Sequence, residues 1–180
     1  MKKTLIATTI ASATLVFTNT VLASENKVYV GASYDMMQID SDLIGSFDSS
    51  VLSVKAGTNF TENLGIEIVA GAGITDSSKF INNLTVTGQI KNYYGAYLTG
   101  TYPINDKFNI TSKLGYANTT IEFKNNEGVK ASDDDSGISW GIGASLRTTE
   151  NVILTADYTM LTDESYGDIT GFTFGAKYTF

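Results

Sequence analysis

The feature that most constrains the fold is a strict alternation of apolar with polar or small residues, which recurs along the chain after about residue 27. In the segment 64–75, the even positions hold Leu, Ile, Ile, Ala, Ala and Ile, whereas the odd positions include Gly, Glu and Thr. Because successive side chains of a β-strand point to opposite faces, this period of two indicates strands with one apolar face. Stripes with helical spacing are absent, so the fold is expected to be all-β.

The alternation predicts eight strands, each 10–12 residues long, at 27–38, 50–60, 64–75, 91–102, 108–119, 137–147, 152–161 and 169–180. A tilted strand needs about 9–11 residues to cross a bilayer, so every predicted strand is long enough to span one. The sequence therefore predicts an eight-stranded antiparallel up-and-down transmembrane β-barrel.

Short and long connections alternate between the predicted strands. The short connections, at 61–63, 103–107 and 148–151, each place an acid just before an apolar strand, and these acids are Glu62, Asp106 and Glu150, 44 residues apart. The long connections are polar and are expected at 39–49, 76–90, 120–136 and 162–168. The repeating unit is therefore a hairpin, with tight turns on one side of a membrane and long loops on the other.

The N-terminal segment has a different pattern. Two lysines precede an apolar stretch from Leu5 to about Phe17, and small residues lead to a cleavage site after Ala23. This pattern is typical of a secretory signal peptide at residues 1–23, which would leave a barrel domain at 24–180. An uncleaved membrane anchor is the alternative. Cleavage removes two of the 12 basic residues and none of the 19 acidic ones, so the formal net charge changes from -7 to -9 (10 minus 19).

Charged residues and glycines share the polar face of the strands. Each Lys or Arg facing lipid near the membrane midplane would cost about 2–4 kcal/mol, so these charges are expected inside the barrel. A soluble barrel with its apolar face inward is the alternative. The residues expected to form an internal network are Asp35, Lys55, Glu67, Lys113, Arg147, Asp157 and Lys177.

The apolar face carries aromatic residues toward both strand ends, which is typical of the aromatic girdles at the two surfaces of a membrane. If the chain starts in the periplasm, the girdle there contains Phe60, Tyr102, Phe108, Tyr178 and Phe180. The girdle near the outer surface contains Tyr34, Tyr94, Tyr116, Trp140, Tyr158 and Phe172.

With its signal peptide, eight alternating strands, long outer loops and final Tyr178-Thr179-Phe180, the chain resembles the small outer-membrane β-barrel proteins of Gram-negative bacteria, the OmpA/OmpX-like group. The resemblance implies a monomer in contact with outer-membrane lipid and lipopolysaccharide. It also implies periplasmic chaperones and the barrel-assembly machinery as partners during biogenesis. In that group, a C-terminal Phe with apolar residues at alternate preceding positions is the signal for assembly. Here the signal maps to Phe172, Phe174, Ala176, Tyr178 and Phe180.

The sequence contains no His and no Cys. Thiol catalysis, His-dependent triads and zinc sites built from these ligands are therefore excluded. The enzymatic outer-membrane barrels, including the lipid A deacylase, palmitoyltransferase, phospholipase and omptin families, resemble one another in using a catalytic His. No enzymatic activity and no cofactor are therefore expected. The run Asp133–Asp135 could bind a divalent cation, but its spacing does not match an EF-hand loop, so a solvated acidic loop is favoured and no metal site is expected.

The acidic residues concentrate in the predicted outer loops, and the overall acidity argues against nucleic acid as a partner. These loops hold only Lys79, Lys124 and Lys130 against Asp40, Asp42, Asp48, Asp76, Glu122, Glu127, Asp133, Asp134, Asp135, Asp163, Glu164 and Asp168. The predicted function is a structural or surface-interaction role, with the loops as the site for any extracellular ligand. The resemblance implies adhesion, invasion or complement resistance. A narrow porin-like channel for ions or small solutes is the alternative, although the charge network is expected to plug an eight-stranded barrel.

Overall fold

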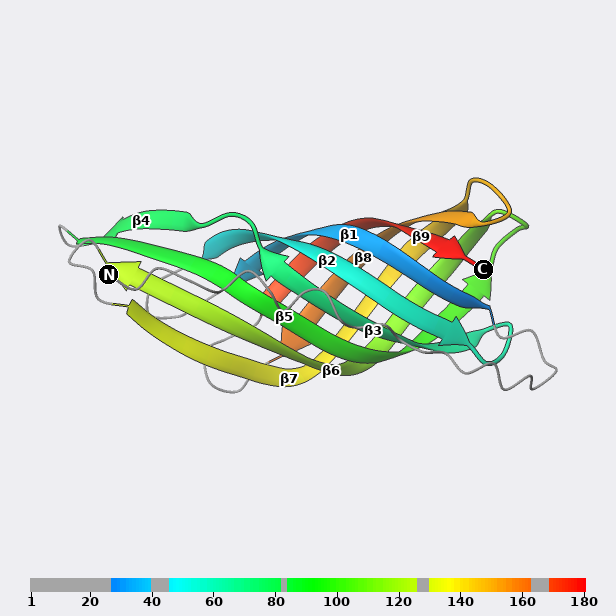
Figure 1. The fold of residues 1–180 in the computed structure, drawn as a ribbon, viewed down its shortest axis with the longest axis horizontal. Helices are drawn as coiled ribbons and strands as arrows, with labels where there is room; N and C mark the ends of the chain where they lie inside the picture. Colours follow the sequence, from blue (N-terminus) through cyan, green and yellow to red (C-terminus); the bar gives the residue numbers. More distant parts are fainter. Residues whose placement is uncertain (1–26, 40–45, 82–83, 126–129, 163–168) are drawn as a thin grey trace, which may run out of the picture.

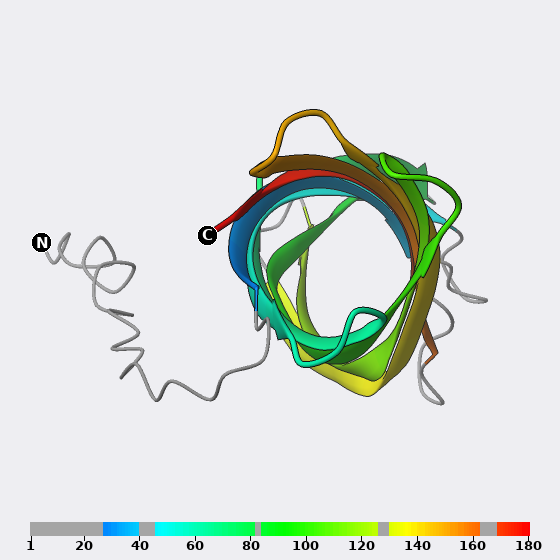
Figure 2. The same ribbon diagram turned by 90° about the vertical axis from the view of Figure 1, so that its right-hand side faces the viewer.

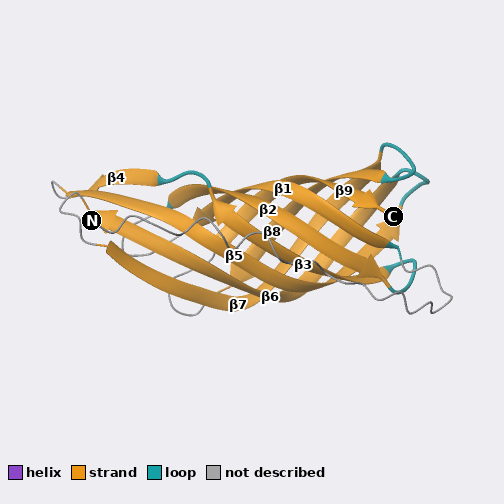
Figure 3. Cartoon of the chain, viewed as in Figure 1, coloured by secondary structure: helices purple, strands orange, loops and turns teal. Residues whose placement is uncertain are grey.

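The computed structural model describes residues 27–39, 46–81, 84–125, 130–162 and 169–180, and the expected signal peptide lies outside these residues. The described part consists of strands and their connections, and it contains no helix that is long and apolar enough to cross a membrane (Figure 3). Its strands are β1 (Val28–Ile39), β2 (Phe47–Asn59), β3 (Leu64–Gly73), β4 (Ser77–Ile81), β5 (Leu84–Pro103), β6 (Phe108–Asn125), β7 (Lys130–Arg147), β8 (Val152–Thr162) and β9 (Ile169–Thr179).

The strands pair antiparallel in the order β3-β2-β1-β9-β8-β7-β6-β5-β4, and an additional pairing of β3 with β5 closes the sheet on itself. The view along the barrel shows this closed ring (Figure 2). Eight strands make up the wall, while the short β4 pairs with β5 outside it. The prediction of an all-β, eight-stranded antiparallel barrel is confirmed, and β4 is an additional strand that the sequence analysis did not predict.

The alternation in the sequence separates the outside of the barrel from its inside. On β3, Glu67 and Val69 are buried, whereas Leu64, Ile66 and Ile68 are 52%, 48% and 52% exposed. A soluble barrel would bury its apolar residues and expose its polar ones. The opposite arrangement is the one that a lipid environment favours.

Aromatic side chains lie on the outward face toward both ends of the apolar band. At one end Tyr158 packs between Trp140 and Phe172, with ring centroids 6.4 Å and 5.2 Å apart. At the other end the rings of Tyr178 and Phe180 have centroids 5.2 Å apart. Tyr and Trp rings combine an apolar body with a polar group and therefore favour the membrane–water interface, so these two groups of rings fit the two surfaces of a membrane.

Three short turns, at 60–63, 104–107 and 148–151, close hairpins at the end of the barrel that lies to the right in Figure 1, which we call the turn end. In the first turn, the N–H groups of Phe60 and Thr61 donate to the carbonyl oxygen of Leu64, at 3.0 Å and 3.2 Å. Equivalent pairs of bonds close the other two turns. The 44-residue interval in the sequence therefore corresponds to one turn structure used three times.

The last residue of each turn also binds the next hairpin through its carbonyl oxygen, which accepts an N–H from that hairpin. Asn63 and Asn151 add a second bond, because their side-chain amides donate to the carbonyl oxygens of Thr101 and Thr179, each at 2.8 Å. The middle turn has Lys107 at this position, and there the carbonyl oxygen alone holds the neighbouring Arg147 N–H, at 2.7 Å.

At the opposite end, which we call the extended end, β5, β6 and β7 run past their neighbours (Figure 1). The pairing of β3 with β5 stops at Ala72 with Asn92, and in the described part of the chain the last pair of β7 with β8 is Ile138 with Thr162. The pairing of β5 with β6 continues to Val86 with Asn125, and that of β6 with β7 continues to Lys124 with Lys130. We call this extension, formed by the described residues of 77–91 and 118–137, the projecting sheet.

The prediction of long loops at 76–90 and 120–136 is therefore wrong over most of their length, because strands β4 to β7 occupy much of these segments. The physical reason is that alternation marks a strand only where its two faces meet different environments. Beyond the apolar band no outward face needs to be apolar, so strand residues there resemble a loop in composition. Most of the other two predicted loops, at 39–49 and 162–168, lies outside the described residues.

Candidate functional site

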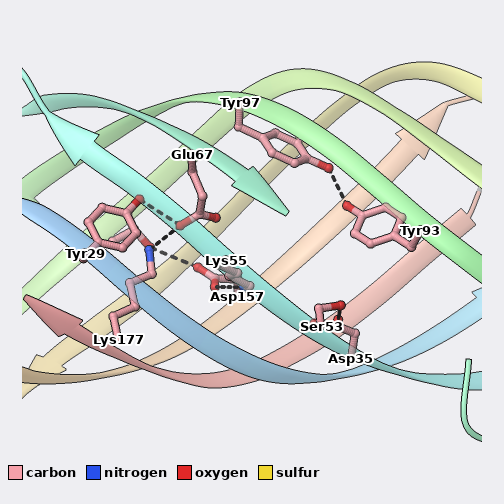
Figure 4. Close-up of polar contacts among 10 residues, drawn as sticks. Tyr29, Asp35, Ser53, Lys55, Glu67, Tyr93, Tyr97, Asp157 and Lys177 are labelled. Carbon is pink, nitrogen blue, oxygen red and sulfur yellow. Dashed lines mark hydrogen bonds and ion pairs between the residues drawn. The ribbon is translucent and has the colours of Figure 1, made fainter. Parts of the chain in front are cut away.

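The barrel interior holds a group of ionisable side chains that come from separate strands (Figure 4). Glu67 on β3 is 4% exposed, and its carboxylate accepts hydrogen bonds from the Tyr29 hydroxyl, at 2.9 Å, and from the Lys177 ammonium, at 2.6 Å. The Lys177 ammonium also lies 4.5 Å from the centre of the Tyr29 ring. One carboxylate thus connects β3 with β1 and β9, whose lysine is 110 residues away in the chain.

A second ion pair lies beside the first. The Lys55 ammonium is 4.0 Å from the Asp157 carboxylate; the Lys55 side chain is buried and that of Asp157 is 14% exposed. Asp157 also accepts a hydrogen bond from the Thr111 hydroxyl, at 3.2 Å. Lys113 lies over the ring of Tyr97, with 5.3 Å from its ammonium to the ring centre. Opposite charges and aromatic faces therefore compensate the buried lysines.

The remaining two members of the expected network differ from each other. Asp35 is buried and accepts a hydrogen bond from the Ser53 hydroxyl. Arg147 is exposed at the end of β7, and among the described residues its side chain forms no ion pair. The structure therefore brings six of the seven expected residues together in the interior and leaves Arg147 at the rim. The alternation along the strand predicted that Arg147 faces inward. Because Arg147 is the last residue of β7, however, it lies at the rim and outside the enclosed interior.

Two glycines leave space for these side chains. A Cβ atom added at Gly57 would overlap the Tyr29 hydroxyl. A Cβ atom added at Gly141 would lie 2.8 Å from Cε of Lys113 and 2.7 Å from the carbonyl oxygen of Tyr158. We call the buried and partly buried ionisable residues the charged cluster: Asp35, Lys55, Glu67, Lys113, Asp157 and Lys177. A larger residue at Gly141 would displace Lys113, a member of this cluster, and one at Gly57 would displace Tyr29, the hydrogen-bond partner of Glu67.

A cavity of about 1140 Å³ occupies the barrel between the turn end and the charged cluster, and we call it the vestibule. Its inner part reaches Glu67, Lys113 and Lys177, and its mouth is bordered by the turns that contain Glu62 and Glu150. The walls are rich in hydroxyl, amide and charged groups, so the vestibule suits water and small ions rather than an apolar ligand.

Tyrosines are the interior residues that the sequence analysis missed. Tyr29, Tyr93 and Tyr97 are buried, and the hydroxyls of Tyr93 and Tyr97 bond to each other. Tyr97 donates a further hydrogen bond to Ser139, at 3.1 Å. The sequence contained a signal for their inward orientation, because Tyr93 and Tyr97 alternate in step with Gly95, which was assigned to the inner face.

The described residues offer no site for a metal ion built from three or more acidic side chains. In the acidic run on β7, Asp134 is exposed and accepts a hydrogen bond from the Thr120 hydroxyl, whereas Asp135 is buried. Because neighbouring strand residues point to opposite faces, these two carboxylates cannot converge on one cation.

A closed eight-stranded barrel with an apolar outer face and a polar interior belongs to the class of transmembrane β-barrels. Residues 8–180 match the family described as outer membrane protein beta-barrel domain. The chain belongs to this family and is located in the bacterial outer membrane. Since such barrels have short turns on the periplasmic side, the turn end faces the periplasm and the extended end faces outward.

Solved structures with the same fold include several outer-membrane proteins. The attachment invasion locus protein Ail of Yersinia pestis is 14% identical, with 87% of this chain and 100% of that chain covered and a TM-score of 0.64. Neisserial surface protein A is 16% identical, with 85% and 97% covered and a TM-score of 0.66. The N-terminal barrel domain of Pseudomonas aeruginosa OprF is 12% identical, with 87% and 100% covered and a TM-score of 0.61. A search of curated proteins found no match.

Proposed function

We propose that this outer-membrane protein is not an enzyme and that its projecting sheet makes contacts at the cell surface. The observation that carries the proposal is the continued pairing of β5 with β6 and of β6 with β7 beyond Asn92, where β3 stops pairing with β5. A barrel that only had to span the membrane would not need these added residues. Ordered strands on a rigid scaffold also lose less conformational entropy on binding than a long loop does.

The sequence predicted strongly acidic outer loops. In the described part of the outer surface, acidic side chains are partly balanced by lysines. Glu122 lies on β6, and its carboxylate is 2.9 Å from the Lys124 ammonium and 3.6 Å from the Lys91 ammonium. Asp48, Asp76 and Asp134 are exposed, whereas Asp135 is buried. The other acids of the predicted loops fall outside the described residues, or have side chains that do: Asp40, Asp42, Glu127, Asp133, Asp163, Glu164 and Asp168. Strongly acidic outer loops therefore remain a prediction from the sequence.

The absence of His and Cys from the sequence supports a non-enzymatic role. The ionisable groups inside the barrel are also engaged with one another, as in the pairs of Glu67 with Lys177 and Lys55 with Asp157, rather than arranged around a substrate-sized apolar pocket. These pairs suit a structural role of the interior, with any ligand bound at the outer surface.

The same proposal includes the assembly signal at the C-terminal strand. Phe172, Phe174, Tyr178 and Phe180 form one row on the outward face of β9 and beyond it, and they are 54%, 53%, 47% and 73% exposed. An exposed row of apolar side chains is available to the barrel-assembly machinery before lipid covers it. Phe180 also donates its N–H to the carbonyl oxygen of Val28, at 3.0 Å, where β9 meets β1 and the chain closes the barrel.

The name of the Yersinia pestis protein, which includes the words attachment and invasion, makes attachment to surfaces the first phenotype to test. We propose a deletion strain assayed for adhesion, survival in serum and sensitivity to detergent. The strain is complemented either with the full chain or with a trimmed variant in which short turns replace residues 77–88 and 123–131. Heat-dependent mobility in gels reports whether each barrel is folded.

The full chain should restore the affected phenotype, and the folded trimmed variant should fail to restore adhesion or serum survival. Restoration by the trimmed variant would show that the projecting sheet is dispensable. A defect confined to detergent sensitivity, restored equally by both forms, would indicate an envelope-stabilising role instead.

A further inference from the structure

A second group of inward side chains is apolar and lies at the extended end of the barrel, where it continues onto the base of the projecting sheet. Its members pack against one another in a single cluster, completed by the edge-to-face contact of Phe47 with Phe123, whose ring centroids are 6.1 Å apart. We call this group the apolar layer. Its buried members are Met37, Ile39, Val51, Val69, Ile90, Tyr93, Tyr97, Ala117, Ile121, Leu161 and Ile169, against which Phe123 packs, and Phe47 joins it through Phe123.

The order of residues along the strands places the apolar layer outward of the charged cluster. On β1, which runs outward, Asp35 precedes Met37 and Ile39. On β8, which also runs outward, Asp157 precedes Leu161. The same order therefore holds on strands from different parts of the wall. The two groups form successive levels that adjoin each other, since Asp35 lies opposite Val51 and Lys55 opposite Val69 in the strand register.

The central side chains of the apolar layer are almost completely inaccessible to water. Phe47, Val51 and Ile90 are 2%, 0% and 1% exposed. Tyr93 contributes a hydroxyl, but this group bonds to Tyr97, which in turn bonds to Ser139. Ions and water cannot pass an apolar constriction of this kind without losing hydration that nothing replaces.

The charged cluster, in contrast, borders open space. The vestibule of about 1140 Å³ reaches Glu67, Lys113, Asp157 and Lys177 from the turn end. Between the charged cluster and the apolar layer there is only a hollow of about 20 Å³. A hollow needs about 10–15 Å³ for one water molecule, so this one holds roughly one.

We infer that the apolar layer, and not the charged cluster, closes the barrel to permeation, so that the vestibule is a water-filled pocket open only to the periplasm. The expectation that interior charges plug the barrel is replaced by two separate roles. The charged cluster connects strands across a wet interior, and the apolar layer is the barrier for water and small ions.

Cysteine accessibility tests this arrangement directly, because the chain has no Cys of its own. Thr99→Cys places a thiol in the wall of the vestibule, Ile121→Cys in the apolar layer and Asp76→Cys on the outer surface. Each variant is reconstituted in vesicles in one orientation and treated with a small cationic thiol reagent on one side at a time. Thr99→Cys should react only from the periplasmic side, Asp76→Cys only from the outer side, and Ile121→Cys from neither.

Reaction of Thr99→Cys from the outer side, or of Ile121→Cys from either side, would overturn the inference. Conductance in planar bilayers gives an independent test. A folded triple variant, Val51→Ser with Ile90→Ser and Ile121→Ser, should show steady conductance, while the wild type and the double variant Glu67→Gln with Lys177→Met should stay closed. Conductance in the wild type or the charged-cluster variant, or a closed triple variant that is folded, would contradict it.

Discussion

The strongest test of the charged cluster is the substitution Glu67→Ala. It removes the acceptor of two hydrogen bonds and leaves the Lys177 ammonium and the Tyr29 hydroxyl without the partner they have in the folded barrel. Both bonds are accepted by a carboxylate, and a hydrogen bond to a charged group contributes about 1.5–3 kcal/mol. The side chain of Lys177 is 19% exposed toward the vestibule, so water can partly replace the lost carboxylate. We therefore expect a decrease in the free energy of unfolding of about 2–3 kcal/mol.

The measurement is urea unfolding of the refolded protein in detergent micelles, with the folded fraction read from heat-dependent gel mobility. Glu62→Ala is the matched control, because Glu62 is an exposed carboxylate in a periplasmic turn. Its substitution should change the free energy of unfolding by less than about 0.5 kcal/mol.

The double variant with Lys177→Met separates the ion pair from the loss of side-chain volume. Glu67 and Lys177 interact at 2.6 Å. The losses of unfolding free energy in the two single variants should therefore add up to about 1 kcal/mol or more above the loss in the double variant. The reasoning is refuted if Glu67→Ala unfolds like the Glu62→Ala control, or if the two single effects simply add.

Four further predictions concern the turns, the interior, the lipid face and assembly. Lys107→Asn should raise the free energy of unfolding by about 0.5–1.5 kcal/mol, because an amide there can make the bond to the next hairpin that the other two turns make; an unchanged urea midpoint would contradict this. Gly141→Ala should lower it by about 1–3 kcal/mol through overlap with Lys113, as measured by the same assay. Leu98→Lys, on the outward face between the girdles, should lower the free energy of unfolding in lipid vesicles by about 2–4 kcal/mol, whereas Ile104→Lys in a turn should have little effect. Equal effects of the two substitutions would show that Leu98 does not face lipid. Phe180→Ser should reduce the amount of folded protein in cells while the purified chain still refolds in detergent, and a normal cellular amount would argue against the assembly signal.

Much of the barrel could be predicted because lipid requires an apolar side chain at every second residue of a membrane-spanning strand. The even positions of 64–75 are apolar since each faces lipid, and the eight strands of the wall were found from this pattern alone. The periplasmic turns were equally visible, because Glu62, Asp106 and Glu150 repeat at a fixed interval. The projecting sheet was missed because its strands leave the membrane, and with it the environment that imposes alternation.

The interior was predicted less completely, because parity gives the face of a residue but not its height in the barrel. Arg147 and Lys113 have the same parity, yet one lies at the rim and the other beside Tyr97. Val69 lies on the face of the predicted strand 64–75 that carries Gly and Glu, and Ile121 fell in a predicted loop, yet in the structure the two belong to one packed apolar layer.

The sequence by itself determined which residues face lipid, how many strands form the wall and where the tight turns lie, because these properties depend on local alternation and turn chemistry. Only the tertiary structure decided that Glu67 meets Lys177 and that charged and apolar interior residues separate into two levels. Those contacts depend on strand register and on the pairing of β1 with β9, which brings the two ends of the strand sequence together and so places residues that are distant in the chain side by side.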